Sequence, residues 1–162
     1  MKRALCFVAL AATAAVLWAQ GPAGKKTLYV YDEVNKNSAP YIELFRSGLA
    51  ERGIAYDEAT AAEAEKKDLA AYDRILIHGM VMAFAGKSPV RDWLKSDPAL
   101  RGKEVHLFVT ANRWKLEKLY GQLAKLLRKD GAVVVDAVSM ATKDLDDAAK
   151  AKAVKDHVAR LK

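Results

Sequence analysis

Short apolar runs alternate with amphipathic segments along most of this 162-residue chain, and this alternation constrains the fold more than any other feature. Most of the apolar runs are continuous, as strands covered on both faces require. The segments between them have the three-and-four spacing of helices and short connecting loops. The pattern predicts an α/β domain with a doubly wound, five-stranded parallel sheet. We expect the strands at residues 27–31, 54–58, 74–78, 104–110 and 132–138.

Helix signals stand between these runs. Proline and serine mark the expected starts, whereas glycine and proline mark the expected ends. In parallel sheets, ligands bind at the carboxyl ends of the strands, so the loops at 32–38, 78–87 and 110–115 are the candidate site segments. The expected helices run from Pro40 to Gly53, over the alanine-rich stretch 60–69, from Ser88 to before Pro98, along the leucine stripe 116–127, and from near Thr142 to Lys162.

The first 19 residues have the order of a secretory signal peptide: a basic start, an apolar run from 4 to 18, and a small residue, Ala19. The apolar run is shorter than the roughly 20 residues that a membrane-spanning helix needs. We therefore expect cleavage after Ala19, with Ala23 as a second candidate, and no membrane span in the mature chain. A polar lead (20–26) and one domain (27–162) would remain.

The single cysteine, Cys6, lies inside the predicted leader. A mature chain without cysteine excludes disulfides, thiol catalysis and cysteine-bound metals. For a secreted protein this suggests the bacterial periplasm, where disulfides are optional.

The remaining chemistry in the sequence is sparse. The three histidines show no paired spacing, so no metal site is predicted. His78 ends an expected strand and is either a buried structural residue or a proton donor at a ligand's edge. The formal net charge is +7, but the sequence contains no basic stripe and no nucleic-acid-binding motif. This argues against a nucleic-acid partner.

Three stretches together resemble the flavodoxin family. They are residues 28–31 with Asn37-Ser38 and Glu43-Leu44, then 72–79, and then 100–110, which are similar to the first strand with its phosphate loop and to the approaches to the two flavin-flanking loops. The resemblance implies the strand order 2-1-3-4-5, non-covalent FMN and electron transfer. It also implies an oxidoreductase activity, with a redox partner protein or a quinone-like molecule as the electron partner.

The loop that would hold the FMN phosphate spans residues 32–38. It contains no glycine, and Asp32 and Glu33 stand at its start, where they should turn away from an anion. Lys36, Asn37 and Ser38 are the candidate phosphate ligands. Ser38 would equally serve as a helix cap.

The flavin ring would lie between the second and third candidate loops. The second loop is unusually apolar. Met80, Met82 and Phe84 are either exposed for a flat ligand or a partner, or packed inward. In the third loop Trp114 either stacks on the ring or belongs to the core. The predicted ring contacts are Met80, Phe84, Gly86, Thr110, Asn112 and Trp114.

Two alternatives remain at this stage. The glycine-free loop favours a binding or interaction module on the same fold that has lost the flavin. Residues 136–142 resemble a motif at which exported proteins receive covalent FMN on threonine, here Thr142, although Met140 replaces a small residue and a helix cap explains the stretch equally well.

Overall fold

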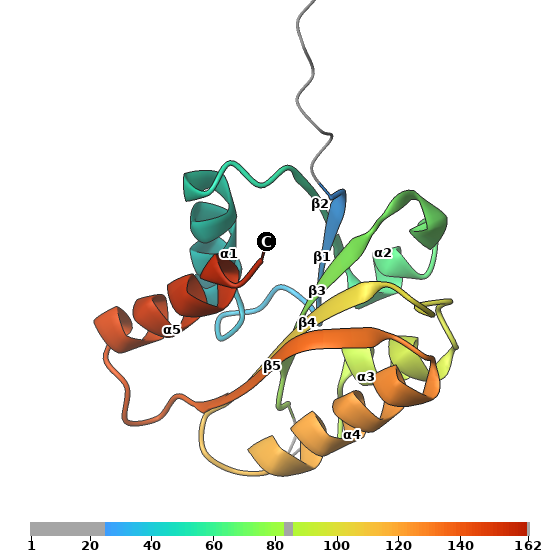
Figure 1. Ribbon diagram of the computed structural model, residues 1–162. Helices are drawn as coiled ribbons and strands as arrows, with labels where there is room; N and C mark the ends of the chain where they lie inside the picture. Colours follow the sequence, from blue (N-terminus) through green and yellow to red (C-terminus); the bar gives the residue numbers. More distant parts are fainter. Residues whose placement is uncertain (1–24, 83–85, 162) are drawn as a thin grey trace, which may run out of the picture.

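A five-stranded parallel sheet with helices on both faces forms the body of the computed structural model (Figure 1). The structure describes residues 25–82 and 86–161. The predicted leader, Cys6 and both candidate cleavage positions therefore lie outside the described residues. The strand order is β2-β1-β3-β4-β5, which confirms the predicted fold and the order 2-1-3-4-5.

The strands form where the apolar runs predict them, within a few residues. The central β1, β3 and β4 are buried along nearly their whole length, because helices cover both of their faces. The edge strand β5 is partly exposed. The bounds are Thr27–Tyr31 (β1), Tyr56–Thr60 (β2), Arg74–Met80 (β3), Glu104–Ala111 (β4) and Val133–Ala141 (β5).

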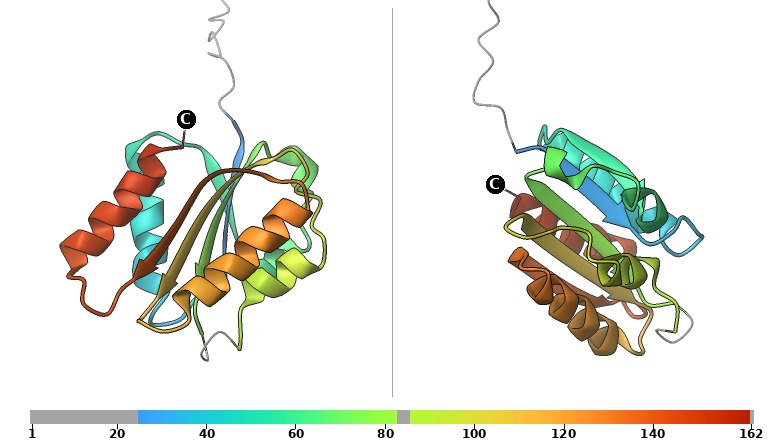
Figure 2. Two further views of the ribbon diagram at one scale, coloured as in Figure 1. Left: turned by 60° about the horizontal axis from the view of Figure 1, so that its bottom comes forward. Right: turned by 90° about the vertical axis from the view of Figure 1, so that its right-hand side faces the viewer.

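The helices lie in two layers (Figure 2). Helices α1 and α5 pack together on one face of the sheet, whereas α2, α3 and α4 cover the other. Each layer encloses its own apolar cluster, one of which is rich in aromatic residues under α1 and α5. The bounds are Ala39–Glu51 (α1), Ala61–Ala64 (α2), Pro89–Lys95 (α3), Leu116–Lys129 (α4) and Asp147–Ala159 (α5), with a 3-10 turn at Leu69–Ala71.

Two helix predictions were wrong in extent. The alanine-rich stretch forms only the short α2 and a separate 3-10 turn, because Thr60 still pairs with Tyr31 in the sheet and caps α2 with its side chain. The last helix begins at Asp147 rather than near Thr142. Strand β5 continues to Ala141, and the Thr142 N–H then donates to the Ala111 carbonyl oxygen.

Among the described residues, no helix combines the length and the apolar character that crossing a lipid bilayer requires.

Candidate functional site

A cleft of about 630 Å³ opens at the carboxyl edge of the sheet, where α1 and α5 begin. The ends of β3 and β4 contribute residues to it, and so does the loop before α1. A cleft at this edge is where ligands of doubly wound sheets bind. The cleft is lined by Lys36, Asn37, Pro40, Tyr41, Leu44, Met80, Val81, Thr110, Ala111, Asn112, Thr142, Asp147 and Lys150.

The structure brings five of the nine predicted site residues together in this cleft: Lys36, Asn37, Met80, Thr110 and Asn112. Ser38 lies behind the loop and is buried. Gly86 and Trp114 are described but do not line the cleft, and Phe84 lies outside the described residues.

The structure decides between the alternatives for three apolar residues. Met80 is buried, because it packs into the aromatic-rich cluster at the end of β3. Met82 is only half-buried and packs against the same cluster. Trp114 does not belong to the core, since its side chain is 68% exposed.

Sequence reasoning missed the contribution of α5. Asp147 and Lys150 line the cleft because α5 packs beside α1 on the same face of the sheet, and Thr142 lines it from the end of β5. Of these, only Thr142 carried a signal, through the motif-like stretch that ends on it. Its hydroxyl donates to the Ala111 carbonyl oxygen at 3.1 Å.

The loop before α1 is closed on itself through the side chain of Asn35. The Asn35 Oδ1 accepts hydrogen bonds from the backbone N–H groups of Asn37 at 2.9 Å and Ser38 at 3.1 Å. The Ala39 N–H donates to the Asn35 carbonyl oxygen. The carboxamide oxygen therefore stands where an anion's oxygen would meet two converging N–H donors.

Ser38 completes this closure. Its hydroxyl donates to the Glu33 carbonyl oxygen at 2.6 Å and accepts from the Asn35 N–H at 2.9 Å. Ser38 occupies the N-cap position of α1, but its side chain makes no capping hydrogen bond to the helix. The N–H groups of Asn35, Asn37, Ser38 and Ala39 are thus all satisfied within the loop.

Three charged side chains line the cleft: Lys36, Lys150 and Asp147. Lys36 is exposed at the loop, and Lys150 stands one turn into α5. Asp147 lies 3.0 Å from the Lys150 ammonium and raises the pKa of Lys150. The cleft therefore offers cationic groups to an anionic ligand from both the loop and α5.

Tyr41 is the aromatic residue among those that line the cleft. Burial raises the pKa of its hydroxyl, and Thr142 and Lys150 oppose this rise. Behind it lies His78, whose ring centroid is 5.6 Å from that of Tyr41. His78 Nε2 and Thr110 Oγ1 are 3.1 Å apart, and burial, with a smaller effect of His157, lowers the His78 pKa to about 3. His78 does not line the cleft, so the geometry supports a structural role for it rather than proton donation to a ligand.

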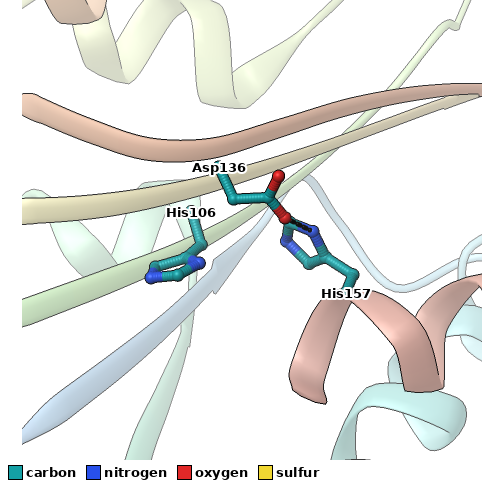
Figure 3. A group of neighbouring side chains, drawn as sticks. All are labelled: His106, Asp136 and His157. Atoms are coloured by element: carbon teal, nitrogen blue, oxygen red, sulfur yellow. Dashed lines mark ion pairs between the residues drawn. The ribbon is translucent and has the colours of Figure 1, made fainter. Parts of the chain in front are cut away.

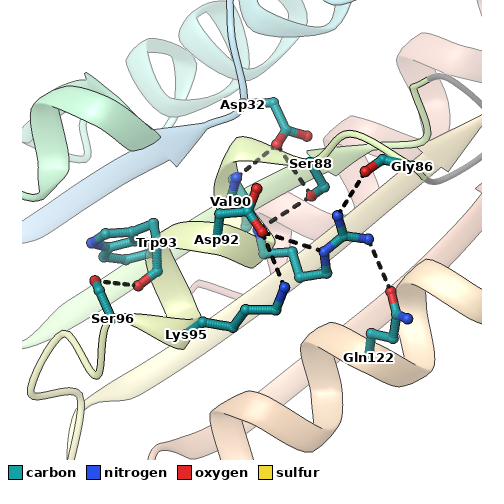
Figure 4. A network of polar contacts seen from close by, with 10 residues as sticks. Asp32, Gly86, Ser88, Val90, Asp92, Trp93, Lys95, Ser96 and Gln122 are labelled. Carbon is teal, nitrogen blue, oxygen red and sulfur yellow. Dashed lines mark hydrogen bonds and ion pairs between the residues drawn. The ribbon is translucent and has the colours of Figure 1, made fainter.

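Asp32 turns away from the loop and joins β1 to the segment after β3. Its carboxylate accepts a hydrogen bond from the Met80 N–H at 2.5 Å. It also accepts one from the Val90 N–H at 2.8 Å (Figure 4). The Ser88 hydroxyl lies 3.4 Å away. Burial raises the Asp32 pKa to about 6, and these hydrogen bonds oppose the rise. Asp32 therefore stabilises the connection to α3.

Replacing Asp32 by serine is expected to destabilise the fold by about 2 kcal/mol, because the shorter side chain leaves the Met80 and Val90 N–H groups buried without an acceptor. Urea unfolding at pH 7 measures this loss. Glu33→Ser is the matched control. It removes an exposed ion pair with Lys87 and should change stability by less than about 1 kcal/mol. An unfolding midpoint for Asp32→Ser equal to that of the control would contradict the assignment.

The chain was compared with known proteins by sequence and by structure. No known protein-family model matches the chain, and no curated protein matches its sequence. Solved structures do match. Flavodoxin 2 from Bacillus cereus superposes with a TM-score of 0.65 at 18% identity, over 84% of this chain and 97% of the flavodoxin.

Two further structures extend the similarity. A Fusobacterium nucleatum flavodoxin mutant bound to flavin mononucleotide has a TM-score of 0.61 at 11% identity, over 86% of this chain and 96% of that one. A flavo di-iron protein mutant from Thermotoga maritima has a TM-score of 0.63 at 15% identity, over 85% of this chain and 35% of that one. The chain thus has a flavodoxin-like fold, as its sequence resemblance implies.

Proposed function

We propose that the protein is a flavodoxin-like electron-transfer domain that binds FMN non-covalently in the cleft where α1 and α5 begin. The observation that carries this proposal is the cleft itself. It lies at the carboxyl edge of a flavodoxin-like sheet, with two lysines among its lining residues. Its volume of about 630 Å³ is within the range of small-molecule sites.

The lining residues fit most of FMN. Met80, Val81 and Leu44 offer apolar contacts, and Asn112 offers a polar side chain. Lys36 and Lys150 would stabilise a phosphate dianion. The Asn35 carboxamide oxygen accepts hydrogen bonds from the N–H groups of residues 37 and 38. The loop can therefore bind the phosphate through these donors only after the carboxamide has moved away.

FMN, when bound, supplies the electron-carrying chemistry, and the chain supplies binding and the surrounding electrostatics. An electron partner would be a redox protein or a quinone-like molecule.

Parallel titrations of FMN and riboflavin, followed by flavin fluorescence, test the proposal. FMN should saturate at one equivalent and bind about tenfold more tightly than riboflavin, because only FMN carries the phosphate that the lysines attract. Saturation by neither flavin would overturn the proposal. Equal affinities would retain a ring site and refute the phosphate assignment.

One observation favours a second function, a binding module that holds a ligand or partner without flavin. The loop donors that would cradle a phosphate are already satisfied by Asn35 and Ser38. Purified protein of this kind would be colourless and would leave both flavins fluorescent.

We also propose that the protein is exported. The order of residues in 1–19 supports a cleaved leader and a periplasmic location. The intact mass of protein recovered from a periplasmic fraction tests this, since a mature chain should lack Cys6. Recovery of the full-length mass there would refute cleavage.

A further inference from the structure

Three ionisable side chains from distant parts of the sequence meet on the sheet face that α5 covers. His106 comes from the middle of β4, Asp136 from β5 and His157 from the last turns of α5 (Figure 3). One ligand atom from each residue lies within 4.8 Å of the others. The cluster is separate from the flavin cleft, since none of the three residues lines it.

A local irregularity in the sheet creates this juxtaposition. The pairing of β4 with β5 shifts after Val105, so that Val105 opposes Val134 while His106 opposes Asp136. The intervening Val135 is the extra residue of a bulge, and its side chain is 53% exposed. Bulges of this kind re-aim side chains, and here the bulge places a carboxylate directly opposite a histidine.

The imidazoles are buried, and their hydrogen bonds are incomplete. His106 is 1% exposed and His157 is fully buried. Nδ1 of His106 and Nε2 of His157 have no hydrogen-bond partner among the described residues. His157 Nδ1 contacts Asp136 Oδ2 at 2.7 Å. Buried imidazole nitrogens without partners are uncommon in structures, and each one requires an explanation.

We propose that His106, Asp136 and His157 bind a divalent transition-metal ion, for which zinc is the best match. Two imidazoles and one carboxylate form a common ligand set for Zn²⁺, with water at the fourth position. Zinc ligands at bond lengths of about 2.1 Å stand about 3.4 Å apart in a tetrahedron. The ligand atoms of the three residues already lie within 4.8 Å of one another.

The surrounding charges set the conditions for binding. Arg160 Nε lies 2.6 Å from the same Asp136 oxygen that faces His157. Arg160 is half-exposed and can move into solvent, where its charge is solvated at little cost. Arg74 is buried near His106 and faces Glu104, which offsets its charge. The incoming ion therefore competes with Arg160 for Asp136.

Binding would join α5 to two strands through one ion. Ligands that bind only the folded state stabilise it by mass action, so zinc should raise the thermal midpoint of the protein in a concentration-dependent way. Mg²⁺, which prefers oxygen ligands, should not.

The first experiment uses the metal alone on the wild-type chain, freed of metal by chelation and without an affinity tag. Zinc titrated by calorimetry should bind at one equivalent. In parallel, imidazole NMR signals report on each of the three histidines in the chain. The signals of His106 and His157 should shift on zinc addition by much more than the signal of His78, which is not a ligand and feels the charge at His157 only from a distance. Binding that shifts no histidine signal, or an absence of binding, overturns the proposal.

Two variants separate a built site from adventitious binding. Asp136→Asn should weaken zinc binding at least about tenfold, because it removes the anionic ligand. Arg160→Gln keeps all three ligands, removes the competing cation and should strengthen zinc binding about tenfold or less. Arg160→Gln also stands alone as a test if Asp136→Asn fails to fold. If Arg160→Gln leaves the zinc affinity unchanged or lowers it, the cluster only fixes α5 against the sheet and the proposal is overturned.

Discussion

Replacing Asn35 by alanine is expected to raise the affinity for FMN about tenfold while leaving the affinity for riboflavin unchanged. The Asn35 carboxamide occupies the N–H groups of Asn37 and Ser38, so a phosphate must displace it before it can use them. Alanine has no acceptor and leaves both donors open to the dianion. Paired FMN and riboflavin titrations of the variant measure the effect.

Asn35→Asp provides the matched control. A carboxylate of the same size can accept from the same two N–H groups, and it also repels the phosphate. FMN affinity should fall, again with little change for riboflavin. If Asn35→Ala binds both flavins more tightly by the same factor, Asn35 acts through the shape of the cleft and the proposed competition is wrong.

The second large effect is a loss of stability in acid that depends on His78. Burial lowers the His78 pKa in the folded state to about 3, below the ordinary value of 6.5. Between these pH values, His78 is therefore protonated in the unfolded chain but neutral in the folded chain. The stability contributed by neutral His78 is complete above pH 6.5 and is lost progressively as the pH falls. From pH 7 to pH 4 this amounts to about 3 kcal/mol.

Comparison with His78→Gln isolates this contribution. Glutamine can keep a hydrogen bond to Thr110 but does not titrate, so the free energies of unfolding of the two proteins should converge as the pH falls from 7 to 4. Asp32 has a raised pKa and acts in the opposite direction, since its proton uptake near pH 6 favours the folded state. It acts in both proteins and cancels in the difference. Parallel curves of unfolding free energy against pH would contradict the assignment to His78.

Much of the fold is predictable from the sequence. Continuous apolar runs mark strands buried on both faces, and the resemblance to flavodoxins implies their order. The errors fall where tertiary contacts override local signals. The alanine-rich stretch has helix formers throughout, yet its first residue, Thr60, pairs in the sheet. The stretch after Thr142 has acidic helix-start residues, yet its backbone first bonds to the end of β4.

The candidate site is predictable only in part. Residues that end strands, such as Met80 and Thr110, are found from strand position alone. The closure of the loop by Asn35 depends on its backbone conformation, which residue types do not determine. The approach of His106 to Asp136 and His157 requires both the bulge at Val135 and the packing of α5, and neither has a local sequence signature.

Backbone amide NMR of the isotope-labelled protein during FMN addition locates the ligand on the fold. With FMN in the cleft, signals should shift in residues 36–41, in 80–82 and in 110–112, together with the start of α5. Signals in the groove near Trp93 and Arg101, on the opposite face, should change little. Shifts confined to that groove, or a spectrum that FMN leaves unchanged at millimolar concentration, would contradict FMN binding in the cleft.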